Sequence, residues 1–255
     1  PESWDNALES IKNEINKRGK ENTITLSGKF TDIETLFSAK LFSESLGSKY
    51  YDCRYDNAQF VSGSKDSYLF NSSIQEVDNA DAILLVGTNP RWEASVLNAR
   101  IRKAYINNNC KIGLIGKKIN LNYKYDQISE NIISLNEILN EENEFSKIML
   151  NAKNPIIIVG TSAINYPSGQ DVLKVCAEIA KKLPNANTKF NPLNILNQDI
   201  SRVGALEIDF YNSFFNENYY ENIFKKINET KPVVFLLGLD EIDPKICDNA
   251  FVVYL

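Results

Sequence analysis

Four short apolar segments, separated by stretches with helical spacing, constrain the fold of this chain most. They are residues 82–87 (AILLVG), 110–116 (CKIGLIG), 154–163 (NPIIIVGTSA) and 231–243 (KPVVFLLGLDEID). Segments apolar on both faces are typical of strands in the centre of a parallel sheet. No hairpin signal joins one strand to the next, so the connections are predicted to be right-handed crossovers through helices. The sequence therefore predicts an α/β fold with parallel sheets and flanking helices.

The first fifty residues predict a helix, a strand and a second helix. Ser3 is a plausible N-cap for a helix over 3–18, and residues 23–27 (TITLS) form the strand. Thr31 and Glu34 stand at capping-box spacing for the second helix, which ends at Gly47. The residues expected to be buried are Trp4, Ala7, Leu8, Ile11 and Ile15 in the first helix and Ile33, Leu36, Phe37 and Leu41 in the second.

A repeated tripeptide suggests how the chain is divided. Val86-Gly87-Thr88 and Val159-Gly160-Thr161 both end a predicted strand, and a helix follows each within about ten residues. We interpret this as two related Rossmann-like halves. The predicted domains are residues 1–150 and residues 151–255; the second is C-terminally incomplete, with a last strand at 250–255 cut off at the end of the sequence. An exposed strand edge favours a covering partner.

Composition excludes several classes of function. The chain has no histidine, which removes the commonest general base and excludes Ser-His and Cys-His nucleophile systems. Its four cysteines, Cys53, Cys110, Cys176 and Cys247, form no CxxC pair, so we expect free thiols and neither a zinc site nor a cluster-binding loop. A net charge of −5 argues against nucleic acid as the main partner. No apolar run reaches the roughly 18–20 residues of a membrane span.

The turn after the strand at 82–87 is the main candidate site. Gly87 would allow close approach of a phosphate, Thr88 and Asn89 offer hydrogen bonds, and Arg91 could pair with an anion at the start of the next helix. Neither GxGxxG nor the P-loop pattern occurs in the chain. The alternative is a purely structural turn, in which glycine ends the strand and Asn-Pro reverses the chain.

Two groups of charged residues are weaker candidates. Four basic residues form the first: Arg100, Arg102 and Lys103, with Lys111 nearby. They could bind an acidic partner or form a solvated helix face. Three acidic residues follow the strand in 231–243, at the end where α/β folds place active sites: Asp240, Glu241 and Asp243. The alternative is that they form only a loop or a helix cap.

The segment 209–224 (DFYNSFFNENYYENIF) concentrates aromatic residues. They are Phe210, Tyr211, Phe214, Phe215, Tyr219, Tyr220 and Phe224. One helical face of them can enter a core, whereas burying all seven in one α/β layer is harder. Tyr and Phe are also favoured at protein interfaces, so core packing and partner contact both remain open.

The stretch 80–105 (ADAILLVGTNPRWEASVLNARIRKAY) resembles a family signature. The chain is similar to the molybdopterin-oxidoreductase-like C-terminal domain of the largest iron–sulfur subunit of respiratory complex I. Further similar stretches occur in the expected order, at 3–8, at 27–42, and in KIGLIG, LNYKYDQI, AKNPIIIVGTSAI and VVFLLGLD. The signature residues are Asp81, Gly87, Thr88, Asn89, Pro90, Arg91, Glu93, Asn98, Ala99, Arg100, Ile101 and Arg102.

The resemblance implies a structural role without an active site in this chain. In that family the turn containing Gly87, Thr88 and Asn89 is a vestigial cofactor loop that holds neither molybdenum nor pterin. Iron–sulfur clusters and FMN are expected in partner subunits of the peripheral, NADH-oxidising arm, which supports electron transfer from NADH to quinone. The cluster-bearing N-terminal half and the family's C-terminal continuation are absent from this sequence, so a split gene or an incomplete sequence is expected.

The implied location is the matrix side of the mitochondrial inner membrane, or in bacteria the cytoplasmic face of the plasma membrane, without a membrane span. Two other functions stay open. One is an oxidoreductase fragment that binds molybdopterin or a nucleotide at the 86–91 turn. The other is a stand-alone binding module that uses the 209–224 aromatic residues.

Overall fold

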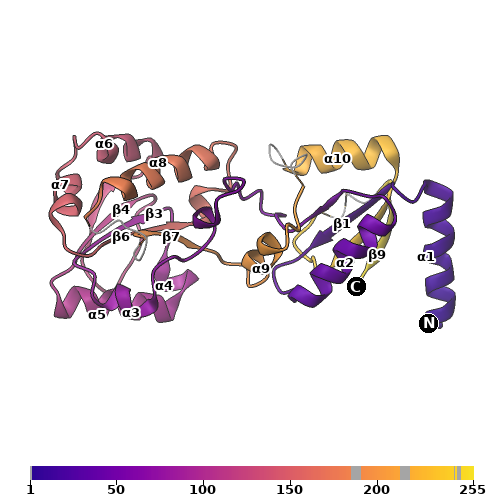
Figure 1. Cartoon of the computed structure of the whole chain (residues 1–255), viewed down its shortest axis with the longest axis horizontal. Coiled ribbons are helices and arrows are strands. Elements are labelled where there is room, and N and C mark those ends of the chain that lie inside the picture. Colours follow the sequence, from indigo (N-terminus) through magenta and orange to yellow (C-terminus); the bar gives the residue numbers. More distant parts are fainter. Residues whose placement is uncertain (1, 185–190, 213–218, 244, 246–247) are drawn as a thin grey trace. The chain divides into compact units, whose positions relative to one another are not determined.

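The computed structural model describes residues 2–184, 191–212, 219–243, 245 and 248–255 (Figure 1). The chain divides into two compact units, each with its own parallel sheet. We call residues 58–198 the central unit, and residues 1–57 together with 199–255 the terminal unit.

The central unit is built on a five-stranded sheet in the order β5-β4-β3-β6-β7, with every pair parallel. Its strands are β3 (Ala82–Val86), β4 (Lys111–Ile115), β5 (Asp126–Ser129), β6 (Pro155–Gly160) and β7 (Leu193–Leu196). Its helices are α3 (Ile74–Asp78), α4 (Pro90–Glu93), α5 (Ser95–Asn107), α6 (Leu135–Leu139), α7 (Glu144–Asn151) and α8 (Gly169–Lys182), with short 3₁₀ turns at Lys65–Ser67, Ile132–Ser134 and Thr161–Ala163.

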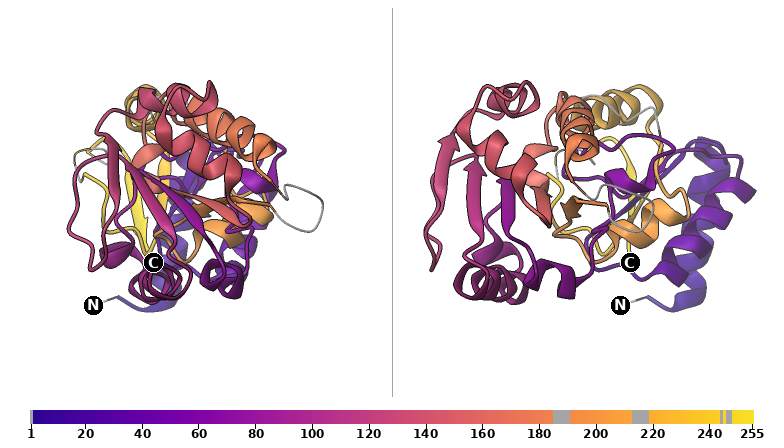
Figure 2. Two further views of the ribbon diagram at one scale, coloured as in Figure 1. Left: turned by 90° about the vertical axis from the view of Figure 1, so that its left-hand side faces the viewer. Right: turned by 60° about the vertical axis from the view of Figure 1, so that its left-hand side comes forward.

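Helices cover both faces of this sheet, as Figures 1 and 2 show. On one face α3 and α5 pack Val77, Leu97 and Ile101 against β3, β4 and β6. Helices α6, α7 and α8 cover the other face. Because β3 lies between two neighbouring strands and two helical layers, all five of its residues are buried. This burial explains the continuous apolar run at 82–86.

The terminal unit contains a four-stranded parallel sheet in the order β2-β1-β8-β9. Its elements are α1 (Trp4–Arg18), β1 (Thr23–Ser27), α2 (Ile33–Ser45), β2 (Tyr51–Asp52), α9 (Arg202–Glu207), α10 (Tyr219–Thr230), β8 (Val233–Leu237) and β9 (Phe251–Tyr254). Ile223 and Ile227 of α10 pack on one face of the sheet, and Ile15 of α1 packs on the other.

The predicted fold class is confirmed, because two parallel sheets flanked by helices form the described chain. The division of the chain differs from the predicted domains 1–150 and 151–255. Strand β6 pairs with β3 in one sheet, and β8 pairs with β1 in the other, so residues on both sides of position 150 share each unit. The repeated tripeptide lies on adjacent strands of a single sheet, with Val86 opposite Val159. Apolar runs and helical spacing predict the individual strands and helices. They do not predict which strands become neighbours in a sheet.

The predicted helix caps are correct in part. The Ser3 hydroxyl accepts a hydrogen bond from the Asn6 amide at 3.2 Å, as a cap of α1 should. Gly47 follows α2 with φ +79°, which suits the predicted C′ position. The cap of α2 is Asp32, which accepts from the Thr35 amide at 2.8 Å. Thr31 instead donates to the Leu237 carbonyl of β8 at 2.9 Å, so a tertiary contact moves the cap by one residue.

The predicted buried stripes of α1 and α2 are largely wrong. Only Ile15 of α1 and Leu36 of α2 are buried among the expected residues. Trp4 and Leu8 of α1 are exposed, as are Ile33, Phe37 and Leu41 of α2. Apolar periodicity identified both helices correctly, but it does not show how far the sheet beneath them extends.

Candidate functional site

A cavity of about 640 Å³ lies at the carboxyl ends of strands β3, β4 and β6. This is the edge of a parallel sheet where α/β proteins usually bind ligands. The three residues predicted from sequence, Gly87, Thr88 and Asn89, all line it. Residues that the sequence did not suggest complete the lining, including Ser162 and Tyr166 from the loops after β6.

Glycines bring the loops at this edge into direct backbone contact. A Cβ atom on Gly87, which has φ +54°, would lie 2.6 Å from the Cβ of Ala163. A Cβ atom on Gly160 would lie 2.5 Å from the Gly87 carbonyl oxygen. The Ser162 hydroxyl also donates a hydrogen bond to that carbonyl. The predicted role of Gly87 was close approach to a phosphate, whereas here the glycines allow two loops of the protein to pack on each other.

Two hydrogen-bond donors of the turn are used within the chain. The carboxylate of Glu93 accepts from the Thr88 hydroxyl at 2.6 Å and from the Asn89 amide at 2.8 Å. Glu93 belongs to the short helix α4 that follows the turn. An anionic ligand at this turn would need the same two donors, and the Glu93 negative charge would repel it.

One polar atom of the turn stays open. The side-chain oxygen of Asn89 is buried and has no hydrogen-bond partner in the described part of the chain. Buried acceptors are nearly always satisfied by protein, water or ligand. This oxygen is therefore an acceptor that the described part of the chain leaves unsatisfied.

The other signature residues support the loops around the cavity. The Arg91 guanidinium, predicted to pair with an anion, donates to the Asn120 carbonyl at 3.2 Å. Asn98 is buried on α5 and accepts from the Tyr123 hydroxyl at 2.7 Å. Its amide donates to the Asn122 side chain at 3.2 Å. The loop after β4 is thus attached to α5 by side chains of the signature.

Two further signature residues, Asp81 and Arg100, hold elements near the opposite edge of the sheet. The Asp81 carboxylate accepts from the backbone amides of Lys153 and Asn154 at 2.7 and 2.8 Å and fixes the chain before β6. Arg100 and Lys103 each donate to Asp78 at 2.8 Å, and these bonds hold the pKa of the Asp78 carboxyl below its ordinary value.

The carboxylates predicted after β8 have structural partners. Glu241 pairs with Lys29 at 2.5 Å, and Asp240 accepts from the Tyr254 hydroxyl at 2.6 Å. Asp243 accepts from the Lys245 amide at 3.0 Å. They form loop and surface contacts, and the described residues contain no group of His, Cys, Asp or Glu that could hold a metal ion.

The cysteines are buried and free where the structure describes them. Cys53, Cys110 and Cys176 form no disulfide, and burial raises the pKa of each thiol to about 12. This agrees with the predicted free thiols for these three positions. Cys247 lies outside the described residues.

Of the described aromatic residues of 209–224, Phe210 belongs to the core, whereas Tyr211 and Phe224 are half-buried. Phe210 is fully buried and contacts the Tyr51 ring, with centroids 5.3 Å apart. The Tyr211 ring faces the Arg54 guanidinium at 5.2 Å. Phe224 packs against the apolar cluster that Ile223 and Ile227 of α10 form with the sheet of the terminal unit. Phe214 and Phe215, and the side chains of Tyr219 and Tyr220, lie outside the described residues.

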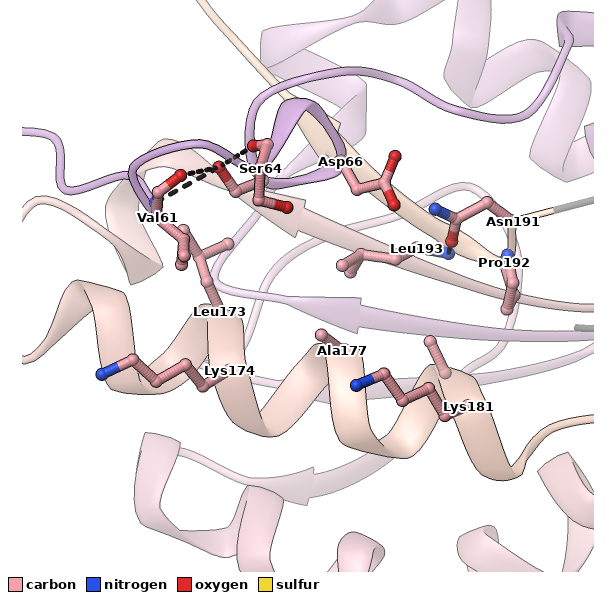
Figure 3. Close-up of a pocket in the computed structure, with 12 residues that line it drawn as sticks. Val61, Ser64, Asp66, Leu173, Lys174, Ala177, Lys181, Asn191, Pro192 and Leu193 are labelled. Atoms are coloured by element: carbon pink, nitrogen blue, oxygen red, sulfur yellow. Dashed lines mark hydrogen bonds between the residues drawn. The ribbon is translucent and has the colours of Figure 1, made fainter. Parts of the chain in front are cut away.

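A second cavity, of about 400 Å³, runs along α8 (Figure 3). Leu173, Ala177 and Leu193 give it an apolar floor, and Lys174 and Lys181 stand along the helix beside it. Lys174 pairs with Asp171 on the same helix at 3.1 Å. The residues predicted from the sequence line the cavity beside Gly87 and not this one, so the cavity beside Gly87 remains the candidate site.

The chain is similar to subunits of NADH dehydrogenases. Over 260 residues it is 34% identical to the NADH-ubiquinone oxidoreductase 78 kDa subunit, mitochondrial, of Candida albicans, covering 99% of this chain and 34% of the relative. It is 31% identical to NADH dehydrogenase [ubiquinone] iron-sulfur protein 1, mitochondrial, of Solanum tuberosum, covering 99% of this chain and 33% of the relative.

A bacterial relative gives the same result. A subunit of the NADH-quinone oxidoreductase of Rickettsia bellii is 30% identical, covering 99% of this chain and 35% of the relative. The chain thus spans about a third of the length of the curated relatives it matches. Among the described helices, none is both long enough and apolar enough to cross a membrane.

The predicted resemblance is confirmed by a family model as well as by these relatives. The model described as molybdopterin oxidoreductase matches residues 1–255, the whole chain. This chain therefore belongs to the molybdopterin oxidoreductase family.

Proposed function

We propose that the chain is a non-catalytic scaffold in the peripheral, NADH-oxidising arm of respiratory complex I. The names of its relatives, at 30–34% identity over nearly the whole chain, support this assembly. In this proposal the iron–sulfur clusters and FMN that carry electrons from NADH to quinone belong to partner subunits. The cluster-bearing N-terminal half of the family is the first of these partners.

The scaffold role is supported above all by the hydrogen bonds that the signature residues make within the chain. Glu93 accepts from two donors of the 87–89 turn, and Asn98 and Arg91 attach the loop after β4. These polar side chains stabilise loops of the protein itself. The signature then serves to keep the carboxyl edge of the sheet in one shape, without a cofactor of its own.

The proposed location follows from the same assembly. It is the matrix side of the mitochondrial inner membrane, or the cytoplasmic face of the plasma membrane in a bacterium, where the chain is held by other subunits. Nucleic acid is not a proposed partner, since a net charge of −5 disfavours phosphate backbones.

Native-gel separation of solubilised membranes tests the assembly. An antibody to this chain and an in-gel NADH dehydrogenase stain should label the same band. Migration of the chain near its own mass of 28.9 kDa, apart from the stained band, would overturn the proposal. Molybdenum analysis and pterin fluorescence of the purified chain test the absence of a cofactor, and stoichiometric pterin or molybdenum would contradict it.

A second function is favoured by one observation, the open acceptor on Asn89. A pterin or nucleobase carries N–H donors that would satisfy it, in a cavity of about 640 Å³. Under this alternative the chain is an oxidoreductase fragment that binds such a ligand at the 86–91 turn. A ligand at ~100 times its Kd should stabilise the fold by about 2.7 kcal/mol, and Asn89→Ala should abolish that shift. Unchanged thermal unfolding with pterin and nucleotides would exclude the alternative.

A further inference from the structure

The outward face of α5 combines exposed apolar and basic side chains. Its inward face carries Leu97, Ile101 and Ala104 into the core. On the outward face, Val96 is 71% exposed and Ile106 is 57% exposed. A helix whose outer face serves only solvation is expected to carry polar residues at such positions. Val96 and Ile106 are therefore apolar side chains that the fold of the central unit leaves uncovered.

Arg102 is the cation of this face that the fold does not use. Arg100 and Lys103 share the carboxylate of Asp78, each at 2.8 Å. Arg102 is exposed, and no hydrogen bond or ion pair links it to any residue in the described part of the chain. In a chain with a net charge of −5, Arg102 therefore presents a positive charge that no counter-ion of the described residues neutralises.

An exposed tryptophan lies next to α5 in the chain. Trp92 of α4, which directly precedes α5, is 81% exposed. Tryptophan and arginine are enriched among the residues that dominate the energy of protein interfaces. Trp92 and Arg102 are thus residue types enriched at interfaces, and Val96 and Ile106 add exposed apolar surface to the same two consecutive helices.

We propose that this surface of α4 and α5 docks an acidic, partly apolar polypeptide segment of a neighbouring subunit. Charge complementarity selects the occupant, because a partner carboxylate would pair with Arg102 while apolar side chains cover Val96 and Ile106. A lipid surface is disfavoured, since only two apolar side chains of α5 face outward and the main apolar face of the helix is already buried. The inference rests on the proposed function, which supplies the assembly containing this partner.

A photo-crosslinking residue in place of Val96, in the chain assembled within the complex, identifies what covers the surface. We expect a cross-link to one subunit, at a peptide containing Asp or Glu and apolar residues. A cross-link to lipid, a cross-link to a basic peptide, or none at all in an assembled complex would overturn the proposal.

Charge reversal provides a second measurement. Arg102→Glu should weaken incorporation of the chain into the complex by about tenfold, the scale expected when a charge contact is lost at an interface. Lys174→Glu on α8 is the matched control, since Lys174 is exposed and pairs only with Asp171 in the described contacts. A reciprocal Glu→Lys or Asp→Lys change at the cross-linked site should restore incorporation of the Arg102→Glu chain.

The outcomes separate the two proposals. Equal incorporation of Arg102→Glu and Lys174→Glu in a complex that contains the chain would overturn the docking surface alone. Absence of the unmodified chain from the NADH-oxidising complex would overturn the proposed function and the docking surface with it. Circular dichroism of the purified variants checks that both charge reversals leave the fold intact.

Discussion

The guanidinium of Arg202 donates a hydrogen bond to the carboxylate of Asp56, 146 residues earlier in the chain, at 2.8 Å. Arg202 is 1% exposed and also binds Asp199. Asp56 and Asp199 lie on the two segments where the chain leaves the terminal unit and returns to it. Tyr55 adds a hydrogen bond to Asp199 at 2.9 Å. One buried arginine thus joins the outgoing and the returning segment.

Replacing Arg202 with alanine should destabilise the terminal unit by about 3–5 kcal/mol. The reason is that removing one partner of a buried ion pair leaves carboxylates without compensation. Urea unfolding followed by circular dichroism measures the change. Arg102→Ala, at an exposed position, serves as the control and should stay within about 0.5 kcal/mol of the unmodified chain. Equal stabilities of the two variants would show that the pair is not needed.

Replacing Gly160 with alanine should destabilise the central unit by about 1–3 kcal/mol, the usual range for overpacking. The added Cβ would lie 2.5 Å from the Gly87 carbonyl oxygen, so the two loops must separate. Gly204→Ala is the control, since its added Cβ meets nothing closer than 3.5 Å and α9 gains from the better helix former. Thermal unfolding compares the two, and a neutral Gly160→Ala would contradict the close packing of the loops.

Replacing Glu93 with alanine should free the Thr88 hydroxyl and the Asn89 amide. We expect a loss of about 1 kcal/mol of stability, as for other lost caps. Glu93→Gln retains one acceptor oxygen and should lose less. Denaturant unfolding of the two variants gives the comparison. A larger loss in the glutamine variant than in the alanine variant would argue against a capping role.

Protonation of Asp78 should weaken its ion pairs at acid pH. The hydrogen bond from Lys103, then the nearby charge of Arg100, lower the pKa of Asp78 from 3.8. The pKa of Asp78 is lower in the folded chain than in the unfolded chain. The Asp78 ion pairs therefore contribute fully to folding stability above pH 3.8, and this contribution is lost as the pH falls through the folded-state pKa. Carboxyl NMR titration should show the pKa of Asp78 rising in Lys103→Ala. An unchanged pKa would mean that Lys103 does not hold the carboxylate in solution.

Cys53, Cys110 and Cys176 should resist thiol reagents in the folded chain. Burial raises the pKa of these thiols to about 12, so the reactive thiolate is scarce near neutral pH, and the folded chain also covers the sulfur atoms. Reaction of a Cys247→Ser chain with a chromogenic disulfide should release no thiolate within minutes and three equivalents after denaturation. Rapid reaction in the native state would contradict the burial.

Residues close together in the chain are sufficient to specify the local elements and their class. The apolar runs that became β3, β4, β6 and β8, the cap at Ser3 and the turn at Gly87 depend on residues close together in the chain. Short-range periodicity and turn chemistry are sufficient to specify such features. The absence of hairpin signals also indicated parallel strands, which both sheets have.

The pairing of distant segments, in contrast, depends on tertiary packing. The pairing of β6 with β3, the pairing of β8 with β1, and the bond from Arg202 to Asp56 join residues far apart in the chain. The exposure of Trp4 and Phe37 depends on how much of each helix the sheet covers. Even Glu93, only five residues from Thr88, acts as a partner because the turn folds back onto it. Periodicity has no information about these contacts, since they depend on packing between surfaces that the sequence does not bring together.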